Sequence, residues 1–204
     1  MKLIKISIAA AVMLLVAAGA MAQQGRFKAD LSYQVGLPVG NLKNVIEKTS
    51  WRGGEVAFMY GVTDALSIGF AVGSQDFSQK YPRTIIHSSG QDVSAVITNS
   101  VQLMPVMAKG SWKLSRMGPV QPFVSLAAGA NFIQYRKYYG EFVDSRSTVG
   151  FVAQPSVGLR IPFSRSGGAG FHVAAGFNYM PFKFNEVDGL HHGVVKAGIS
   201  IPLQ

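Results

Sequence analysis

Eight segments of this chain alternate apolar residues with small or polar ones, and this pattern constrains the fold more than any other feature. Side chains along a β-strand point to its two faces in turn, so each segment predicts a strand with one apolar face. The segment at 66–73 is the clearest. Its apolar face carries Leu66, Ile68, Phe70 and Val72, and its other face carries Ser67, Gly69, Ala71 and Gly73. The other predicted strands cover 27–37, 55–62, 104–114, 124–132, 150–161, 171–179 and 195–203.

The first 22 residues have the composition of a secretion signal. Lys2 and Lys5 precede an apolar run from 6 to 19, and Ala20-Met21-Ala22 fits the small-x-small cleavage rule. We therefore expect residues 1–22 to be a cleaved signal peptide and residues 23–204 to form one barrel domain. An uncleaved anchor is the alternative, and the cleavage motif argues against it. Export also argues against nucleic acid as the partner of the basic surface, whose formal net charge is +9 before Lys2 and Lys5 are removed.

The part of the chain after residue 22 contains no apolar run of the roughly 18 residues that a membrane helix needs. If this part crosses a bilayer, it must do so as a closed β-barrel, because lipid cannot satisfy the open edge of a sheet. Charged residues make up only 14% of the chain, whereas soluble domains usually carry about a quarter. The chain has no cysteine, which excludes a disulfide framework and a thiolate metal site.

Alternation alone does not tell which face of a barrel is outside. A soluble barrel of the lipocalin kind would turn the apolar face inward around a ligand. Its outer surface would then consist of serine, glycine and alanine, whereas soluble proteins expose many charged residues. Small residues suit the crowded interior of a narrow barrel instead. We therefore predict an all-β fold, an eight-stranded antiparallel up-and-down transmembrane β-barrel with its apolar face toward lipid.

The predicted links between strands are alternately short and long. The short links are 63–65, 115–121 and 164–170, and the long ones are 38–53, 75–92, 134–147 and 182–191. Bacterial outer-membrane barrels have short periplasmic turns and longer surface loops. An even number of strands brings both termini to the same end, so we expect both termini in the periplasm.

Four prolines fall within or beside the predicted strands. They are Pro105, Pro155, Pro181 and Pro202. Because proline removes a hydrogen-bond donor from the ladder, we expect bulges or strand ends at these positions.

Several short stretches carry a family likeness that covers essentially the whole chain after the signal. They are YQVGLPVGNLK at 33–43, LMPVMAKGSW at 103–112, QPFVSLAAG at 121–129 and KAGIS at 196–200. Together with the strand pattern they resemble the OmpA-like and OmpX-like eight-stranded outer-membrane barrels, especially the small porin-family proteins of the Bacteroidetes type. The resemblance implies the outer membrane of a Gram-negative cell envelope and is specific for architecture, not for an activity. The chain departs from the family at Leu203-Gln204, where these barrels typically end in an aromatic residue.

Six charged residues fall on the predicted inner face: Lys28, Asp30, Glu55, Lys109, Arg160 and Lys196. A tube of eight strands leaves room only for side chains. One interpretation is a gated conduit for small solutes, and the other is a paired polar plug that replaces a hydrophobic core. We favour the plug. Since two acids face four bases, some bases must reach water at the ends of the barrel.

A basic and aromatic group falls in the predicted surface loops. Lys80, Arg83, Arg136 and Lys137 are interleaved there with Tyr81, Tyr135, Tyr138 and Tyr139. One interpretation is contact with the phosphates of lipopolysaccharide, with tyrosines at headgroup level. The other is an ordinary interfacial girdle with solvated charges. The sequence favours neither.

Two histidine motifs invite a chemical interpretation. His87-Ser88, with Asp92 nearby, resembles the residue types of outer-membrane lipases and lipid A deacylases, but nucleophilic catalysis needs the base within reach of the nucleophile. The motif falls near a predicted loop tip, so we interpret it as a solvated turn and predict no catalytic residue. His191 and His192 are adjacent and should point to opposite faces of a strand, so we expect no metal and no cofactor.

The link at 75–92 predicts a long hairpin. Continuing the expected pairs Ile68–Trp112 and Phe70–Gly110 closes a turn at 89–91, with arms longer than the roughly 9–11 residues that cross a membrane. The excess, 77–87 and 93–102, should project above the surface. Its open edges would recruit a partner strand by β-augmentation.

These observations predict a monomeric, non-enzymatic outer-membrane barrel with a structural or surface-binding role. Its expected partners are outer-membrane lipid, lipopolysaccharide and an extracellular protein bound through the 77–102 hairpin. Two alternatives stay open, which are a porin for small solutes and a lipid A-modifying hydrolase that uses His87 and Ser88.

Overall fold

The computed structural model describes residues 27–203 except 83, 89–90, 96, 116–117, 140–141, 164–168, 182 and 185–186. The expected signal peptide at 1–22 lies outside the described residues, so its cleavage stays a prediction. Within the described ranges, no helix is both long and apolar enough to cross a bilayer.

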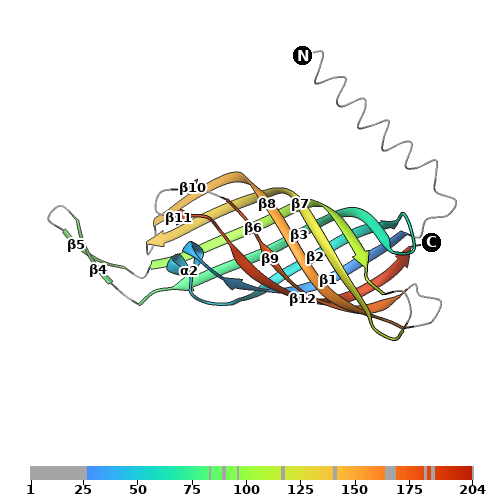
Figure 1. Ribbon diagram of the computed structural model, residues 1–204. Helices are drawn as coiled ribbons and strands as arrows, with labels where there is room; N and C mark the ends of the chain where they lie inside the picture. The colour runs from blue at the N-terminus through green and yellow to red at the C-terminus, as the bar shows by residue number, and fades with distance from the viewer. Residues whose placement is uncertain are drawn as a thin grey trace, which may run out of the picture.

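Eight strands close into one antiparallel barrel (Figure 1). They are β1 (Phe27–Pro38), β2 (Ser50–Gly61), β3 (Leu66–Lys80), β6 (Ile97–Lys113), β7 (Gln121–Tyr139), β8 (Phe142–Pro162), β9 (Gly170–Asn178) and β12 (His192–Leu203). Each strand pairs with its neighbours along the chain, and β1 pairs with β12 to close the barrel. The predicted strand count, antiparallel order and closure are confirmed.

The two ends of the barrel differ. Phe27 pairs with both Tyr60 and Leu203, so the described chain begins and ends at the same end, where the short links also lie. We call this the turn end. The opposite, loop end carries the helix α2 (Asn41–Val45), the hairpin of β4 (Thr84–Ser88) and β5 (Gln91–Ala95), and the short pair β10 (Lys183–Phe184) and β11 (Val187–Asp188).

The apolar face of the strands forms the outer wall. Phe70 is 52% exposed and Leu126 is 59% exposed, whereas their neighbours Ala71 and Ala127 are 0% and 2% exposed. The predicted orientation is therefore confirmed, with small and polar residues inside. An outer wall of exposed Phe, Leu, Val and Ile requires hydrocarbon around it, because monomeric soluble proteins rarely expose such continuous apolar surface.

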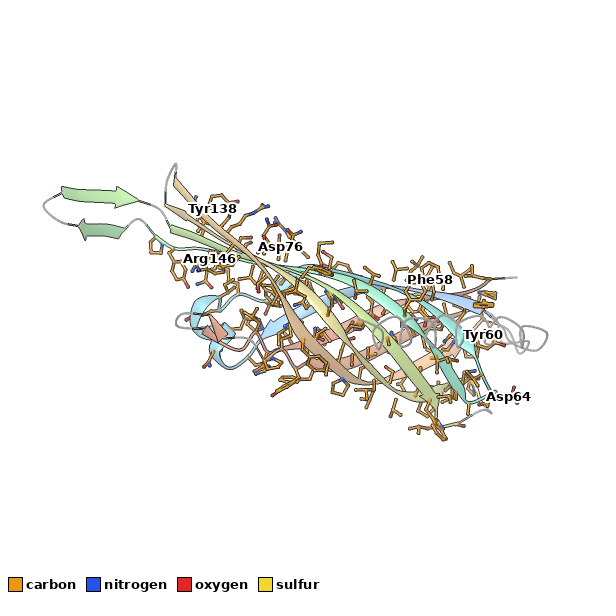
Figure 2. The ribbon with its side chains drawn as sticks, turned by 90° about the horizontal axis from the view of Figure 1, so that it is seen from above. Phe58, Tyr60, Asp64, Asp76, Tyr138 and Arg146 are labelled. Carbon is orange, nitrogen blue, oxygen red and sulfur yellow. The ribbon has the colours of Figure 1, made fainter. Side chains whose placement is uncertain are left out.

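Four consecutive strands are much longer than the rest. β3, β6, β7 and β8 have 15, 17, 19 and 21 residues, and the other barrel strands have at most 12. Their extra residues at 78–80, 97–100, 136–139 and 142–145 pair with one another beyond the barrel. We call this the projecting sheet. Figure 2 shows Tyr138 and Arg146 at this end of the molecule and Tyr60 and Asp64 at the other.

The projecting sheet corrects the prediction of a long loop at 134–147. β7 continues to Tyr139 and β8 begins at Phe142, so strand fills nearly all of this link. Two other predicted loops also contain structure, since α2 lies in 38–53 and the β10–β11 pair lies in 182–191. The expected loops are therefore shorter than the alternation indicated.

The register between β3 and β6 differs from the predicted one. Trp112 pairs with Leu66 and Gly110 pairs with Ile68, two residues away from the expected partners. A shift of two residues keeps every side chain on the same face of the sheet, so the apolar pattern cannot detect it.

The predicted hairpin is present as a separate ribbon beyond the barrel strands. β4 pairs with β5 from Thr84↔Ala95 to Ser88↔Gln91, which flanks residues 89–90. Figure 1 shows this ribbon as the part of the described chain farthest from the barrel. Its predicted role in binding a partner stays a prediction.

The prolines fit the expectation only in part. Pro181 follows β9 and Pro202 is the last residue but one of β12, so both lie at strand ends as predicted. Pro105 and Pro155 lie inside β6 and β8, where the ladders to β3 and to β9 are interrupted without a change of register. They form no bulge, because each keeps its pairing with β7 on the other side.

Candidate functional site

A carboxylate lies between two lysines in the middle of the lumen. Glu55 of β2 is 3% exposed, and its Oε1 lies 2.7 Å from Nζ of Lys109 on β6. Nζ of Lys196 on β12 donates to Oε2 of the same carboxylate. Alternation turns all three side chains inward, and the closure of the barrel brings their strands together. One carboxylate carries one negative charge, so the two lysines together keep one positive charge in excess.

A chain of polar side chains continues from Lys196 toward the loop end. Nζ of Lys196 donates to Oε1 of Gln154, Nε2 of Gln154 donates to Oδ1 of Asn178 over 2.6 Å, and Nδ2 of Asn178 donates to Nε2 of His192 over 2.7 Å. Nδ1 of His192 lies 3.1 Å from the carbonyl oxygen of Leu190. An ammonium group only donates, so Lys196 fixes the orientation of each amide in turn. His192 therefore carries its hydrogen on Nδ1. We call these four side chains the polar relay.

Sequence reasoning did not select Gln154, Asn178 and His192 as site residues. Gln154 and Asn178 fell on the predicted inner face, but they were passed over because they are uncharged. The expectation that the two adjacent histidines point apart is confirmed. The ring of His191 stacks on Tyr179 outside the barrel, with centroids 4.8 Å apart, while His192 is completely buried with its ring edge against Phe77.

The turn end of the lumen holds a small polar cavity of about 30 Å³. Lys28, Asp30, Lys109, Arg160 and Lys196 line it, so five of the six predicted interior charges meet there. Nζ of Lys28 lies 3.5 Å from Oδ2 of Asp30, and Arg160 is buried in the wall. His172, which sequence reasoning also passed over, lines the cavity with its Nε2 2.8 Å from Oγ of Ser32.

The loop end of the lumen is closed by apolar side chains. Leu42 and Ile46 from the α2 segment pack there with residues of the barrel strands and of the 180–190 segment. The strand and loop members are Phe77, Val101, Leu103, Ile133, Val152, Met180 and Leu190. We call this the apolar cap. The sequence did not indicate it, because its members come partly from segments that lack periodic patterning.

The four predicted surface bases lie on or beside long strands and not in loops. Lys80 ends β3 and is exposed, and Arg136 in β7 donates from Nη2 to Oε1 of Gln134 over 2.9 Å. Lys80 and Tyr138 are both partners of Thr98, which puts Lys80 and Arg136 on the same outer face of the sheet. Lys137 lies in β7 with its side chain outside the described part, and Arg83 lies outside the described residues altogether.

The His87-Ser88 pair, which resembles the residue types of lipid A deacylases, lies in the hairpin of β4 and β5. His87 and Ser88 are in β4, and His87 is the register partner of Asp92 in β5. The side chains of these residues lie outside the described part. Among the described residues, no group of three or more His, Asp or Glu side chains is arranged to hold a metal ion.

A closed antiparallel barrel of eight strands with an apolar outer wall and a polar lumen is a transmembrane β-barrel of the outer-membrane type. Solved structures agree with this class. The chain is similar to Neisserial surface protein A, with a TM-score of 0.51 and 13% identity over 87% of this chain and 96% of that one. This likeness shows the fold and supports an outer-membrane location.

Two further solved barrels are similar over most of their length. Ail, the attachment invasion locus protein of Yersinia pestis, has a TM-score of 0.46 and 14% identity over 88% of this chain and 97% of that one. The N-terminal β-barrel domain of Pseudomonas aeruginosa OprF has a TM-score of 0.45 and 14% identity over 88% of this chain and 100% of that one. No protein-family model and no curated protein sequence matches the chain.

Proposed function

We propose that this chain is a non-catalytic outer-membrane barrel that binds a partner outside the cell through its projecting sheet. The observation that carries the proposal is a filled lumen beneath a sheet with open edges. With the projecting sheet outside the cell, the turn end of the barrel and both ends of the chain face the periplasm. The barrel anchors the sheet and contributes to the integrity of the envelope.

The open edge of β8 is the part of the sheet best suited to strand addition. Among the described residues, the backbone of 142–148 pairs only with β7, and it lies beyond the lipid-facing pair of Phe132 and Val149. Seven residues at about 3.4 Å each make an edge of roughly 24 Å. Natural edge strands are usually protected by proline, by charged side chains (lysine above all) or by a bulge, and the sequence FVDSRST has no proline and no lysine, its charged residues being Asp144 and Arg146. An extended peptide therefore fits this edge, in addition to the hairpin that the sequence indicated.

Peptide selection followed by hydrogen exchange tests the strand-addition proposal. A random peptide library is selected on the barrel in lipid nanodiscs, and exchange is measured with and without the selected peptides. We expect bound peptides to slow exchange at the amides of 142–148. The double change Ser147→Pro and Thr148→Pro should abolish this binding, while deletion of 84–95 should leave it intact. Selected peptides that protect only the hairpin, or no peptides at all, would contradict binding at β8.

The filled lumen argues against the porin alternative. Three layers of side chains occupy it, which are the cationic residues at the turn end, the Glu55 ion pairs in the middle and the apolar cap. We expect no stepwise conductance above background in planar bilayers. Reproducible channels in the wild-type protein would favour the porin.

The bases above the apolar wall supply a second contact with the membrane. Lys80 and Arg136 lie on the outer face of their strands, beyond the lipid-facing residues Val72 and Phe132. We propose that these two bases, with Arg83, contact the phosphates of lipopolysaccharide. Lys137 directly follows Arg136 in β7 and so belongs to the other face of the strand. Thermal unfolding of K80Q/R136Q should lose the stabilisation that lipopolysaccharide gives over phospholipid alone. Arg146→Gln, on the opposite face of the sheet, is the matched control and should keep it.

Catalysis is not part of the proposal. A lipid A-modifying activity that uses His87 and Ser88 is tested by mass spectrometry of lipid A from cells that carry H87A or S88A. We expect the same lipid A species in the wild-type and variant cells. A change of acylation in both variants would establish the hydrolase instead.

A further inference from the structure

A groove crosses the strands on the outer wall of the barrel. Its two sides are rows of outward side chains that are register partners on neighbouring strands. The rows are Val124, Val157, Ala175 and Val195 on one side, and Pro122, Leu159 and Val173 on the other. Phe123, Gly158 and Ala174 lie between the rows and turn toward the lumen, so the floor is backbone. A Cβ atom on Gly158 would lie 2.6 Å from Cζ of Phe123, so this ring closes the floor from inside.

The groove is bounded by larger side chains on both sides. Leu126 and Phe177 are the next outward residues toward the loop end on β7 and β9. Ile161 and Phe171, which pair with each other, are the next outward residues toward the turn end. The sides of the groove itself are mostly valine, alanine and proline, which are shorter. The hollow is therefore a local feature of the lipid-facing wall.

The groove begins at the turn end and rises into the bilayer. Leu114, directly after the end of β6, lines its start, and Val195, in the loop-end half of β12, lines its far end. From β6 to β12 it takes four steps between neighbouring strands, which is roughly 19 Å at about 4.8 Å a step. Because the strands of such barrels are tilted by about 45°, a groove that crosses them rises by roughly 13 Å. This rise is close to one leaflet, which is half of a hydrocarbon core of about 30 Å.

An occupant of this groove has to be apolar and thin. All side chains that line it are apolar, and the outer wall is surrounded by hydrocarbon, so a polar ligand would lose its water without compensation. The two rows are two residues apart along each strand, which is about 7 Å. An α-helix with its side chains is about 10–12 Å across and is too wide to enter. A single hydrocarbon chain fits this width.

We propose that the groove binds one acyl chain of a phospholipid in the periplasmic leaflet. The chain enters at Leu114, at headgroup level, and runs toward Val195. The choice of leaflet rests on the proposed function, in which the turn end faces the periplasm. Lipopolysaccharide lies outside the cell in the opposite leaflet, so its chains start at the other end of the barrel. The site differs in place and in ligand from the contact proposed for Lys80 and Arg136.

Lipid retention in native mass spectrometry tests the site. The wild-type barrel is reconstituted in vesicles of phosphatidylethanolamine, phosphatidylglycerol and lipopolysaccharide, and it is then extracted in a mild detergent. We expect one phospholipid to remain bound to each barrel. Ala175→Phe fills the groove and should lose most of this phospholipid. Ala128→Phe adds the same ring to the outer wall of β7 outside the groove, and it should keep the phospholipid.

Two outcomes of this test count against the proposal. Equal loss in A175F and A128F would mean that the whole wall holds lipid without a preferred site. Retention of lipopolysaccharide in place of phospholipid would assign the groove to the other leaflet. If A175F does not fold, V173F takes its place. The selection of peptides at β8 does not depend on the groove, so the two proposals fail separately.

Photocrosslinking locates the bound chain. A phosphatidylethanolamine with a diazirine in the middle of one acyl chain is added to the vesicles, and the labelled residues are mapped after illumination. We expect the label to concentrate at 157–159 and 173–175 in the wild-type barrel and to leave these residues in A175F. A label spread evenly over the outer wall would overturn the proposal. Links between two barrels through these residues would overturn it as well, because a second copy would then fill the groove.

Discussion

Asn178 donates a hydrogen bond of 2.7 Å to Nε2 of His192, and this contact joins the polar lumen to the apolar cap. On one side, Asn178 continues through Gln154 to the ion pairs of Glu55. On the other side, Nδ1 of His192 donates a hydrogen bond to the backbone oxygen of Leu190, a member of the cap. The loop end is thus connected through side chains to the middle of the barrel, and the segment at 189–192 is held from inside.

Asn178→Ala tests this connection. The change leaves Nε2 of His192 and one amide hydrogen of Gln154 without their partners in a buried site, which costs about 1–3 kcal/mol for each such group. We expect a lower free energy of unfolding in urea and faster hydrogen exchange at the Leu190 amide, which bonds to the oxygen of Met180. Ser147→Ala on the exposed part of β8 is the control and should change neither measurement.

Glu55→Gln should be among the most destabilising single changes in the lumen. It leaves the buried Lys196 and the partly buried Lys109 without the carboxylate that they share. Removal of one partner from a buried ion pair costs about 3–5 kcal/mol. Lys196→Met should cost less, because Glu55 keeps its contact with Lys109 at 2.7 Å. Urea unfolding in lipid vesicles, followed by the fluorescence of Trp51 and Trp112, measures both. An equal cost for the two changes would show that Glu55 is not the centre of the network.

The sequence predicted the features that alternation controls. It predicted eight strands, their order, the lipid-facing wall and the inward placement of Lys28, Asp30, Glu55, Lys109, Arg160 and Lys196. These follow from the two-residue period, because a bilayer and a narrow lumen impose opposite demands on the two faces of each strand.

The projecting sheet was not predicted, and the reason again lies in the two-residue period. Beyond the membrane both faces of a strand meet water, so Gln134, Arg136 and Ser145 need not alternate with apolar residues. Such segments look like loops to any argument from periodicity, although β7 and β8 pair through them without interruption. The register of β3 against β6 was not predicted either, since a shift of two residues leaves each side chain on the same face of the sheet.

The apolar cap could not be inferred from local pattern at all. Leu42 and Ile46 stand in a short helical turn and the residue after it, and they are buried only because the chain folds back over the mouth of the barrel. Their partners Phe77 and Leu190 are distant in sequence. A cap of this kind depends on tertiary contacts that alternation within single strands does not encode.

Glycine at position 129 is required by a close approach of neighbouring strands. A Cβ atom there would lie 2.1 Å from the backbone oxygen of Val106, which is far inside contact distance. Gly129→Ala should therefore destabilise the barrel by about 1–3 kcal/mol, the usual cost of overpacking. Gly110→Ala is the matched control, because a Cβ there meets nothing within 4 Å. Denaturation midpoints of the two variants give the comparison, and similar midpoints would mean that β6 and β7 can separate to admit the methyl group.

The last prediction concerns the outer wall and depends on depth in the bilayer. Ala108 lies on the outer face of β6 between its register partners Phe70 and Ala128, in the middle of the apolar band. Ala108→Arg should cost about 2–4 kcal/mol, because a charge on the lipid face near the midplane cannot reach water. Leu114 is 63% exposed and follows the end of β6 at the turn end, so Leu114→Arg should cost only about 0–1 kcal/mol. The difference between the two variants, measured by unfolding in lipid vesicles, should disappear in a water-soluble protein, since both positions would then face solvent.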